Sequence, residues 1–382
     1  MSFDVVTHSE VRRLAQSLDK GMGLQLRSRS VWKGPERFAP GVRVGGDSPY
    51  RMLPKFNPDL YMEHVCHNGE VYVGTQISGA SAYYGIYTST DLKNWLTRSS
   101  WNPINKVAVF GKAILIWGGS SSSQMIQLST DNATTFVAVT GTGLYLSNIC
   151  GAGAYGYAFT TSTLNYFYLI HSTGQRDTVT MPEARAWKYV LHNGSRYVAL
   201  DSTCERAYSS DNGSTNWMAS SGLDMAIATA PSNYGSTSLR QPYVVNGQFV
   251  ILDISVGSIT SIISDNGINW RIGNRGLLFE RDSFIIEVSK NGAIYDGALY
   301  ISVRITNGVV GDIGRFSILE TRDGINFRLL PSFYTGRSTA VENTPGVCAK
   351  LDGTGIFFNS SASLIGARYE TDPRATEVYH AL

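Results

Sequence analysis

Six carboxylates in this 382-residue sequence are of the residue type that glycosidic-bond hydrolysis requires. That reaction uses two carboxyl groups roughly 5 to 10 Å apart, one as an acid and the other as a base or nucleophile. The candidates are Glu183, Asp201, Glu205, Glu280, Asp282 and Glu287. Their spacing along the chain pairs none of them with another. The sequence therefore predicts no catalytic residue, and a glycoside hydrolase is the alternative to a non-enzymatic protein.

The run His64-Val65-Cys66-His67 has the residue types of a metal site. On a strand, however, successive side chains point to opposite faces, so His67 points away from His64 and Cys66. A structural zinc site needs about four convergent ligands. The sequence also lacks a phosphate-binding loop and a G-x-G-x-x-G turn after a strand. We therefore predict no metal and no cofactor. The pI of about 8.2 makes nucleic acid an unlikely partner of the main body of the chain.

The composition indicates which elements must position these residues. Charged residues make up 16% of the chain, against roughly 25% in an average domain. Apolar residues make up 43%, enough for a buried core, so intrinsic disorder is excluded. No apolar run reaches the roughly 18 residues of a membrane span. The 39 glycines, 21 tyrosines and only 12 prolines predict an all-β chain of short strands and tight turns.

The first eight residues, Met1–His8, lack the basic and apolar regions of a secretory signal. We therefore expect synthesis and folding in a cytoplasm, where thiols stay reduced. The four cysteines show no C-x-x-C spacing, and they are expected to be small buried side chains rather than ligands or disulfides. They are Cys66, Cys150, Cys204 and Cys348.

Seven short apolar segments are each followed by a glycine-containing turn and a second apolar segment. Asn-Gly and Asp-Gly suit type I′ hairpins, in which both central residues have positive φ. The seven turns lie at Asn68-Gly69, Phe110-Gly111, Ala152-Gly153, Asn193-Gly194, Asn246-Gly247, Asp296-Gly297 and Asp352-Gly353. Seven hairpins in one chain predict an internal repeat.

A second signal follows five of these hairpins in the same phase: a hydroxyl residue, an aspartate and then an aromatic residue. Its members are Ser89, Asp91 and Trp95; Ser129, Asp131 and Phe136; Ser209, Asp211 and Trp217; Ser264, Asp265 and Trp270; Thr321, Asp323 and Phe327. Degenerate copies lie at residues 171–174 and 370–372. Two signals with one phase predict seven repeated units.

The pattern Ser-x-Asp-x-Gly-x-x-Trp resembles the Asp-box, or BNR repeat, of sialidase-like β-propellers. In that family the motif lies on the turn between the third and fourth strands of a blade. The resemblance implies a structural role, in which Ser and Asp side chains bind backbone N–H groups. The aromatic residue is expected to lie between neighbouring blades. The distance from aspartate to aromatic departs from the motif: it is four residues after Asp91 and Asp323, five after Asp131 and Asp265, and six after Asp211.

We therefore predict an all-β fold, a seven-bladed β-propeller of four-stranded antiparallel blades over residues 56–382. The strands expected in the fifth unit are Pro242–Asn246, Gln248–Asp253, Ser258–Ser264 and Asn269–Gly273. A six-bladed ring is the alternative if the third unit, which has the weakest signals, is an irregular insertion. Glu377–Leu382 is expected as the outer strand of the last blade. The ring would then close by side-chain packing or by a strand from the amino-terminal segment.

Residues 1–55 lie outside the repeat and are predicted to form an amino-terminal docking arm. A short helix is expected at Ser9–Asp19, because a capping pattern precedes apolar residues at helical spacing. The rest of the arm is expected to be extended. The arm carries ten Lys/Arg against five Asp/Glu, whereas the remainder carries 22 against 25. This separation of charge, with an apolar stripe too small to form a core, favours attachment to another protein.

The resemblance also implies a test for sialidase chemistry. Sialidases carry an Arg-Ile-Pro motif, two further substrate-binding arginines, an acid/base carboxylate and a Tyr–Glu nucleophile pair. The nearest match here, Arg51-Met52-Leu53-Pro54, has one residue too many. Arg185, Arg240 and Arg304 are available, but nothing in the sequence brings them to one site. We therefore predict no sialidase activity and no arginine triad.

The function predicted from these features is that of a non-enzymatic structural or interaction module of a virion. The composition, poor in charge and rich in Gly, Ser, Thr, Asn and Tyr, resembles bacteriophage tail and tail-appendage proteins. The expected partners are other tail proteins, bound through residues 1–55, and a host surface glycan or receptor, bound through propeller loops. Membrane insertion is not expected. The alternatives are a carbohydrate-binding propeller and a diverged sialidase-like glycosidase.

Overall fold

The computed structural model describes the chain from residue 50 to residue 369 with gaps, so the predicted helix Ser9–Asp19 and the predicted strand Glu377–Leu382 lie outside the described residues. The described residues are 50–52, 62–76, 85–90, 94–99, 104–118, 125–139, 146–161, 163–229, 239–255, 258–278, 285–295, 297–306, 315–329, 333–334, 346–349, 356–360 and 363–369.

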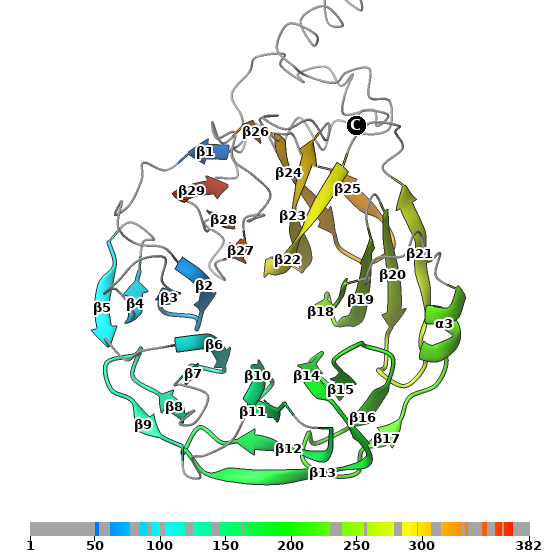
Figure 1. Cartoon of the computed structure of the whole chain (residues 1–382), viewed down its shortest axis with the longest axis horizontal. Coiled ribbons are helices and arrows are strands. Elements are labelled where there is room, and N and C mark those ends of the chain that lie inside the picture. The colour runs from blue at the N-terminus through cyan, green and yellow to red at the C-terminus, as the bar shows by residue number, and fades with distance from the viewer. Residues whose placement is uncertain are drawn as a thin grey trace, which may run out of the picture.

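Antiparallel sheets arranged around a common centre form the architecture (Figure 1). The first three sheets, each given from its innermost to its outermost strand, have the following bounds. They are β2 (Met62–His67), β3 (Tyr72–Gln76), β4 (Gly85–Ser89) and β5 (Leu96–Ser99); β6 (Ile104–Phe110), β7 (Ala113–Gly118), β8 (Met125–Ser129) and β9 (Val137–Ala138); β10 (Leu146–Ala152), β11 (Tyr155–Thr160), β12 (Leu164–Ile170) and β13 (Arg176–Arg185). The third unit, whose sequence signals are weakest, thus forms a four-stranded sheet.

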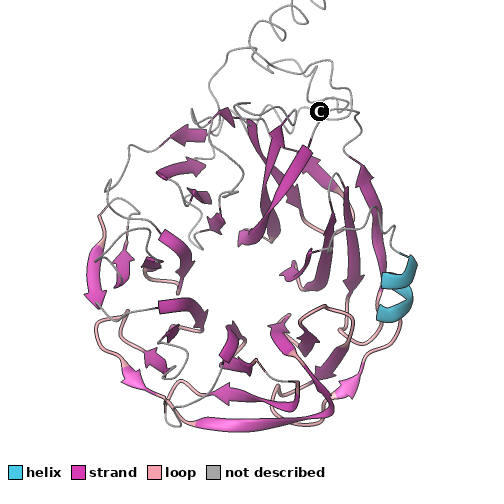
Figure 2. Cartoon of the chain, in the orientation of Figure 1, coloured by secondary structure: helices cyan, strands magenta, loops and turns pink. Residues whose placement is uncertain are grey.

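The next three sheets repeat this order. They are β14 (Trp187–His192), β15 (Tyr197–Asp201), β16 (Ala207–Ser210) and β17 (Met218–Ala219); β18 (Leu239–Val245), β19 (Gln248–Ser255), β20 (Ser258–Ser264) and β21 (Arg271–Leu278); β22 (Ile285–Tyr295), β23 (Ala298–Thr306), β24 (Arg315–Thr321) and β25 (Phe327–Leu329), with β26 (Phe333–Tyr334) also paired to β24. Figure 2 shows how strands dominate the ring.

The last sheet joins the two ends of the described chain. Its strands are β27 (Gly346–Ala349), β28 (Ile356–Ser360), β29 (Ser363–Tyr369) and β1 (Tyr50–Met52), with β1 outermost. Tyr50 pairs with Tyr369, and Met52 pairs with Ala367. The strand supplied by the amino-terminal segment was one of the two expected ways of closing the ring. Three residues of the segment predicted as an arm therefore belong to a sheet of the ring.

Seven sheets are found among the described residues. Their inner strands contact one another around the centre, from β2 through β6, β10, β14, β18 and β22 to β27, which contacts β2 again. An all-β propeller is thus confirmed as the fold class. In the described part of the chain, no helix is both long and apolar enough to cross a membrane.

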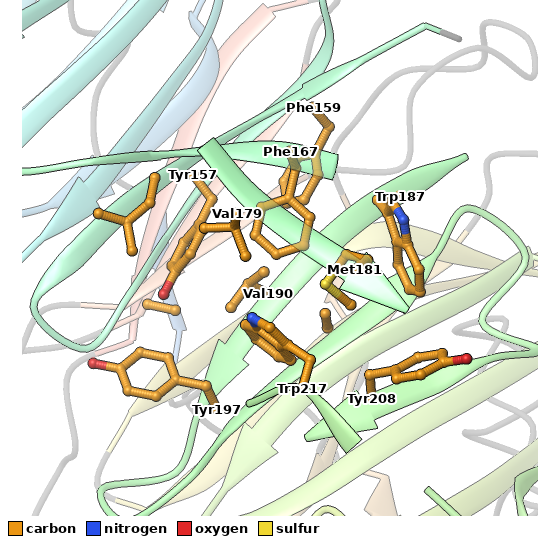
Figure 3. Packing of buried hydrophobic residues seen from close by; sticks show 13 residues of the cluster. Tyr157, Phe159, Phe167, Val179, Met181, Trp187, Val190, Tyr197, Tyr208 and Trp217 are labelled. Carbon is orange, nitrogen blue, oxygen red and sulfur yellow. The ribbon is translucent and has the colours of Figure 1, made fainter. Parts of the chain in front are cut away.

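The core is divided among the interfaces between neighbouring sheets. Figure 3 shows the cluster between the third and fourth sheets, in which Phe167 packs edge-on against Trp217 at 5.8 Å between ring centres. Both side chains are almost fully buried. Edge-to-face aromatic pairs add about 0.5–1.5 kcal/mol to the burial of their area. Each sheet therefore depends on its neighbours for its apolar faces.

The repeat signals predict no helix between the fourth and fifth units, but the structure has α3 (Leu223–Thr229) there. Leu223 and Ala226 are buried in the cluster shared by the fourth and fifth sheets. Gly222 precedes the helix and has a φ of +78°. Residues that carry a side chain rarely adopt this backbone angle. The apolar residues Leu223, Ala226 and Ile227 are at helical spacing, so the sequence did contain this signal.

Two His-Asn-Gly turns make the same contact between neighbouring sheets. Asn68 donates a hydrogen bond from Nδ2 to the carbonyl oxygen of Lys112 at 3.1 Å, in the next sheet. Asn193 donates in the same way to the carbonyl oxygen of Gly247 at 2.9 Å. In each turn the asparagine Oδ1 also accepts hydrogen bonds from backbone N–H groups of its own hairpin. These asparagines therefore shape one hairpin and fasten it to the next.

Candidate functional site

Side-chain hydrogen bonds to the backbone hold the described turns between third and fourth strands. In the second sheet, Asp131 Oδ1 accepts from the Thr135 backbone N–H at 2.9 Å, and Oδ2 accepts from the Thr135 hydroxyl at 2.6 Å. Ser129 Oγ donates to Asp131 at 2.8 Å. The hydroxyl and backbone hydrogen bonds of Thr135, with that of Ser129, lower the pKa of Asp131 to about 2. This carboxylate therefore has a structural use.

The fourth and fifth sheets use different residues from those predicted. Ser210 and Asn212, not Ser209 and Asp211, form the fourth turn: Asn212 Oδ1 accepts from Ser214 and Thr215 N–H at 3.0 and 2.9 Å. Ser210 Oγ accepts from Gly213 N–H at 3.1 Å. Asp211 instead forms an ion pair with Arg196 at 2.6 Å. The pattern Ser-Ser-Asp-Asn contains two overlapping candidates, and the glycine position selects the later one.

In the fifth turn the serine is the predicted Ser264, but Asn266 replaces Asp265 as the acceptor. Asn266 Oδ1 accepts from the Ile268 and Asn269 N–H groups, each at 2.9 Å. With both corrections, the distance from acceptor to aromatic residue is four or five residues in each of the five turns that have this signal, and none has the six-residue distance. In the sixth turn Asp323 accepts from Ile325 and Asn326 N–H as predicted, each at 2.8 Å. Asp91 lies outside the described residues.

The aromatic residues of these turns lie where one sheet meets the preceding one. Trp217 and Trp270 are each 5% exposed and belong to the clusters of the third and fourth and of the fourth and fifth sheets. Phe136 and Phe327 are half-buried against the equivalent clusters. Trp95 is half-buried as well. Four of the five aromatic residues, Phe136, Trp217, Trp270 and Phe327, therefore lie between neighbouring sheets, and of these only Trp217 and Trp270 are buried.

Three of the six candidate carboxylates, Glu183, Asp201 and Glu205, are bound by other groups of the chain. Glu183 binds Arg185 at 2.6 Å and accepts from the Tyr208 hydroxyl at 3.1 Å. Asp201 is buried and accepts from the Glu205 and Arg206 N–H groups at 2.8 and 3.2 Å, which orders the turn after β15. Glu280 and Asp282 lie outside the described residues, and Glu287 is on β22, opposite Arg304 in register.

Glu205 belongs to a charged group that joins the fourth and fifth sheets. Arg240, on the innermost strand β18, binds Glu205 at 3.0 Å and Asp253 at 3.1 Å. The side chains of Arg240 and Asp253 are only 14% and 12% exposed. Arg240 also donates to the Thr203 carbonyl at 2.9 Å. Removing one partner of such a group leaves an uncompensated buried charge, so the group fastens the two sheets together.

The arginines considered for substrate binding lie on different layers of the ring. Arg51 is on β1 and Arg185 on β13, which are outermost strands of different sheets, whereas Arg240 is on the innermost strand β18. Arg304 is on β23, the second strand of its sheet. Their strands therefore do not gather these four arginines around the ring centre. Among the residues that the structure describes, no group of three or more His, Cys, Asp or Glu is placed to hold a metal ion.

A polar group that the sequence did not suggest lies on the inner strands. It comprises Lys106 on β6, Asn148 and Cys150 on β10, and Lys188 on β14, and we call it the inner-ring lysine site. Lys106 Nζ donates to Asn148 Oδ1 at 2.5 Å, and Asn148 Nδ2 donates to the Lys188 carbonyl at 2.7 Å. These contacts cross three consecutive sheets.

Irregular pairing helps to create this site. Near the start of the inner strand, the register to the second strand skips one residue in each of the first four sheets. The skipped residues are Glu63, Asn105, Ser147 and Lys188. A bulge of this kind changes the face to which the following side chains point. Simple alternation along the sequence therefore does not reveal that Lys106 and Asn148 meet.

Comparisons with known proteins agree with the fold. The propeller domain of Cps50 (Swd1) from Myceliophteria thermophila aligns with 81% of this chain and 95% of its own, at 9% identity and a TM-score of 0.50. The RRP9 WD40 repeats align with 81% of this chain and 90% of their own, at 10% identity and a TM-score of 0.48. A GH74 xyloglucanase from Xanthomonas campestris aligns with 82% of this chain and 52% of its own, at 12% identity and a TM-score of 0.49. This chain therefore spans about half of that enzyme. The sequence matches no protein-family model and no curated protein. Likeness at such low identity shows a β-propeller and no particular activity.

Proposed function

We propose that this chain is a non-enzymatic interaction module of a virion, most specifically of a bacteriophage tail or tail appendage. The observation that carries the proposal is that four described carboxylates are bound by other groups of the chain. Glu183, Asp201, Glu205 and Asp131 are each bound by arginines, hydroxyls or backbone N–H groups of the chain itself. A rigid ring whose charged side chains lock turns and sheets together is suited to presenting surfaces to partners.

In this proposal the two parts of the chain have different tasks. Residues 1–55, with their excess of basic side chains, attach the chain to other tail proteins. The propeller is the outward platform that meets a host receptor or surface glycan. The low content of charged residues and the high content of Gly, Ser, Thr and Tyr support this assignment, because they are typical of tail appendages.

The proposal is tested on particles of the virus that encodes the chain. Particles are purified by density gradient, and their proteins are quantified by mass spectrometry beside a viral replication protein as the control for contamination. We expect the chain in a fixed ratio to the major tail protein, with the replication protein absent. Recovery of the chain only from the soluble fraction of the lysate would refute the virion assignment.

A carbohydrate-binding propeller is the second candidate, and one cluster favours it. Tyr155 lies edge-on to His171 at 5.4 Å between ring centres and 6.1 Å from Tyr197. Beside it, Asp177 is 48% exposed and is bound by His171 at 2.7 Å and by Gln175 at 3.2 Å. Aromatic faces beside exposed carboxylate and amide groups are the side chains that bind sugars by apolar and polar contacts together.

A glycan array separates this second candidate from the first. Binding to one glycan class that is lost in both Tyr155→Ala and Asp177→Asn would establish carbohydrate recognition at this cluster. Lys112→Met, on an exposed side chain elsewhere, is the control that should still bind. Hydrolysis of an activated sialoside that disappears in Arg51→Ala would instead establish the diverged glycosidase and refute the non-enzymatic assignment.

A further inference from the structure

The inner-ring lysine site holds a positive charge that the described residues do not neutralise. Lys106 is partly buried, and its Nζ donates a hydrogen bond to the neutral amide oxygen of Asn148. Neither Lys106 nor Lys188 takes part in the ion pairs found among the described residues. A buried charge without a counterion is costly unless something compensates it.

The groups around Lys106 are fixed in place. Asn148 cannot turn its amide without losing its hydrogen bond to the Lys188 carbonyl, so Oδ1 stays directed at Lys106. Cys150 Sγ is held between the N–H and carbonyl of Val190, at 3.4 and 3.5 Å. The amino group of Lys188 lies 5.3 Å from the centre of the Tyr189 ring. The positions of these groups are therefore set before any ligand binds.

Three effects act on Lys106. Burial, the largest, lowers its pKa, the neighbouring Cys150 raises it, and the Lys188 ammonium lowers it. Burial also raises the pKa of the Cys150 thiol to about 11, which keeps it neutral at physiological pH. On the described strands packed around Lys106, these are the titratable groups that act on it. Two ammonium groups, a neutral thiol and a neutral amide would together attract an anion.

We propose that Lys106 and Lys188 bind a small oxyanion, a carboxylate or a phosphate group, at the inner ends of the second, third and fourth sheets. Lysine binds such groups as a point charge with three rotatable donors. Asn148 is a positioning residue, because it holds Lys106 and is itself held by the backbone of β14. The site is separate from the aromatic cluster at Tyr155 and does not depend on the virion assignment.

Isothermal titration of the full chain with inorganic phosphate and, separately, with citrate tests the proposal at constant ionic strength. We expect saturable binding of at least one of the two, and their affinities distinguish a phosphate site from a carboxylate site. Lys106→Met and Lys188→Met should each weaken binding at least tenfold. Lys112→Met removes an exposed lysine outside the site and should leave the affinity unchanged. Binding weaker at pH 10 than at pH 7 is expected, because the ammonium form is required.

Thermal unfolding in the absence of anion provides the second readout. Methionine keeps the length of Lys106 and removes its uncompensated charge, so Lys106→Met should unfold at the same temperature as the wild type or higher, while losing the anion-dependent increase. The proposal is overturned if neither anion binds, if Lys106→Met binds like the wild type, or if that variant unfolds at a lower temperature and no anion raises the unfolding temperature of the wild type. The last result would give Lys106 a purely structural role.

Discussion

At the scale of single residues, the turns between third and fourth strands require a side-chain oxygen and not a negative charge. Asp131 and Asp323 supply it in the second and sixth sheets, whereas Asn212 and Asn266 supply it in the fourth and fifth. The acceptor geometry is shared, and the carboxylate or amide group is interchangeable. Aspartate therefore adds only a dependence on pH.

Asp131→Asn tests this interchangeability. The folded pKa of about 2 lies below the ordinary value of 3.8, so the stabilisation from Asp131 is present above pH 3.8 and is lost as the pH falls towards 2. We expect Asp131→Asn to unfold near the wild-type temperature at pH 7 and to lose less stability than the wild type between pH 4 and pH 2. Asp131→Ala should unfold at a lower temperature at pH 7. Equal acid sensitivity in wild type and Asp131→Asn would contradict this account.

Trp270 offers a second test at this scale, because it is 5% exposed and packs between the fourth and fifth sheets. Trp270→Ala should lower the free energy of unfolding by about 3–5 kcal/mol. Its neighbour Arg271 is 56% exposed, and Arg271→Ala should change that free energy by less than about 0.5 kcal/mol. Denaturant unfolding of both variants measures the difference. If Trp270→Ala changed the free energy of unfolding as little as Arg271→Ala, Trp270 would not stabilise the interface between the two sheets.

At the scale of elements, the sequence predicted strands and turns, but not the contacts between side chains of different sheets. In the fifth unit the predicted strands Gln248–Asp253 and Ser258–Ser264 match β19 and β20 closely. Alternation and turn residues are local signals, so they sufficed here. The choice of Asn266 over Asp265 was missed although its contacts are local, because both are turn-forming residues. Asn266 accepts from the N–H groups of Ile268 and Asn269, two and three residues further along the chain.

The candidate sites divide in the same way. The turns themselves were found from the sequence because their partners are two to five residues away, although the acceptor was placed one residue too early in the fourth and fifth turns. Lys106 and Asn148 were not, because they are 42 residues apart and meet only after the bulges at Asn105 and Ser147 shift their strands. No repeat signal carries this information.

The glycine of the turn provides a prediction for an element. Gly267 has a φ of +69°, and a Cβ there would lie 2.4 Å from Val198 Cγ2 of the fourth sheet. Gly194 has a φ of +99°, and a Cβ there would meet nothing within 4 Å. Both substitutions by alanine strain the backbone, but only Gly267→Ala also pushes two sheets apart. Gly267→Ala should therefore lower the unfolding temperature clearly more than Gly194→Ala, and equal effects would disprove the close approach.

At the scale of the whole molecule, the ring is closed by a strand from each end of the described chain. β1 pairs with β29, so the last sheet has four strands only with residues 50–52 present. The division predicted at residue 55 therefore separates an arm from a propeller to which its final residues also contribute. Whether residues 1–49 dock onto a partner stays a prediction.

Two truncations distinguish the tasks of this segment. Deletion of residues 1–32 leaves β1 in place, so we expect a soluble propeller with a near wild-type unfolding temperature that no longer joins its assembly. Deletion of residues 1–54 removes β1 and leaves the edge of β29 unpaired, so its unfolding temperature should fall and its tendency to aggregate should rise. Normal assembly of the shorter deletion would refute the docking arm, and equal stability of both would refute closure by β1.

The pairing of Tyr50 with Tyr369 also has a consequence for how the protein is made. The two residues are 319 positions apart, so the first of the described strands to leave the ribosome finds its partner last. At roughly 5–20 residues per second, translation keeps β1 waiting on the order of 15 to 60 seconds, while the other sheets stack as an open arc. Until then the nascent chain has two unsealed ends. Its period of greatest exposure to chaperones and to neighbouring nascent chains is therefore set by translation speed, not by the intrinsic folding rate of any single sheet.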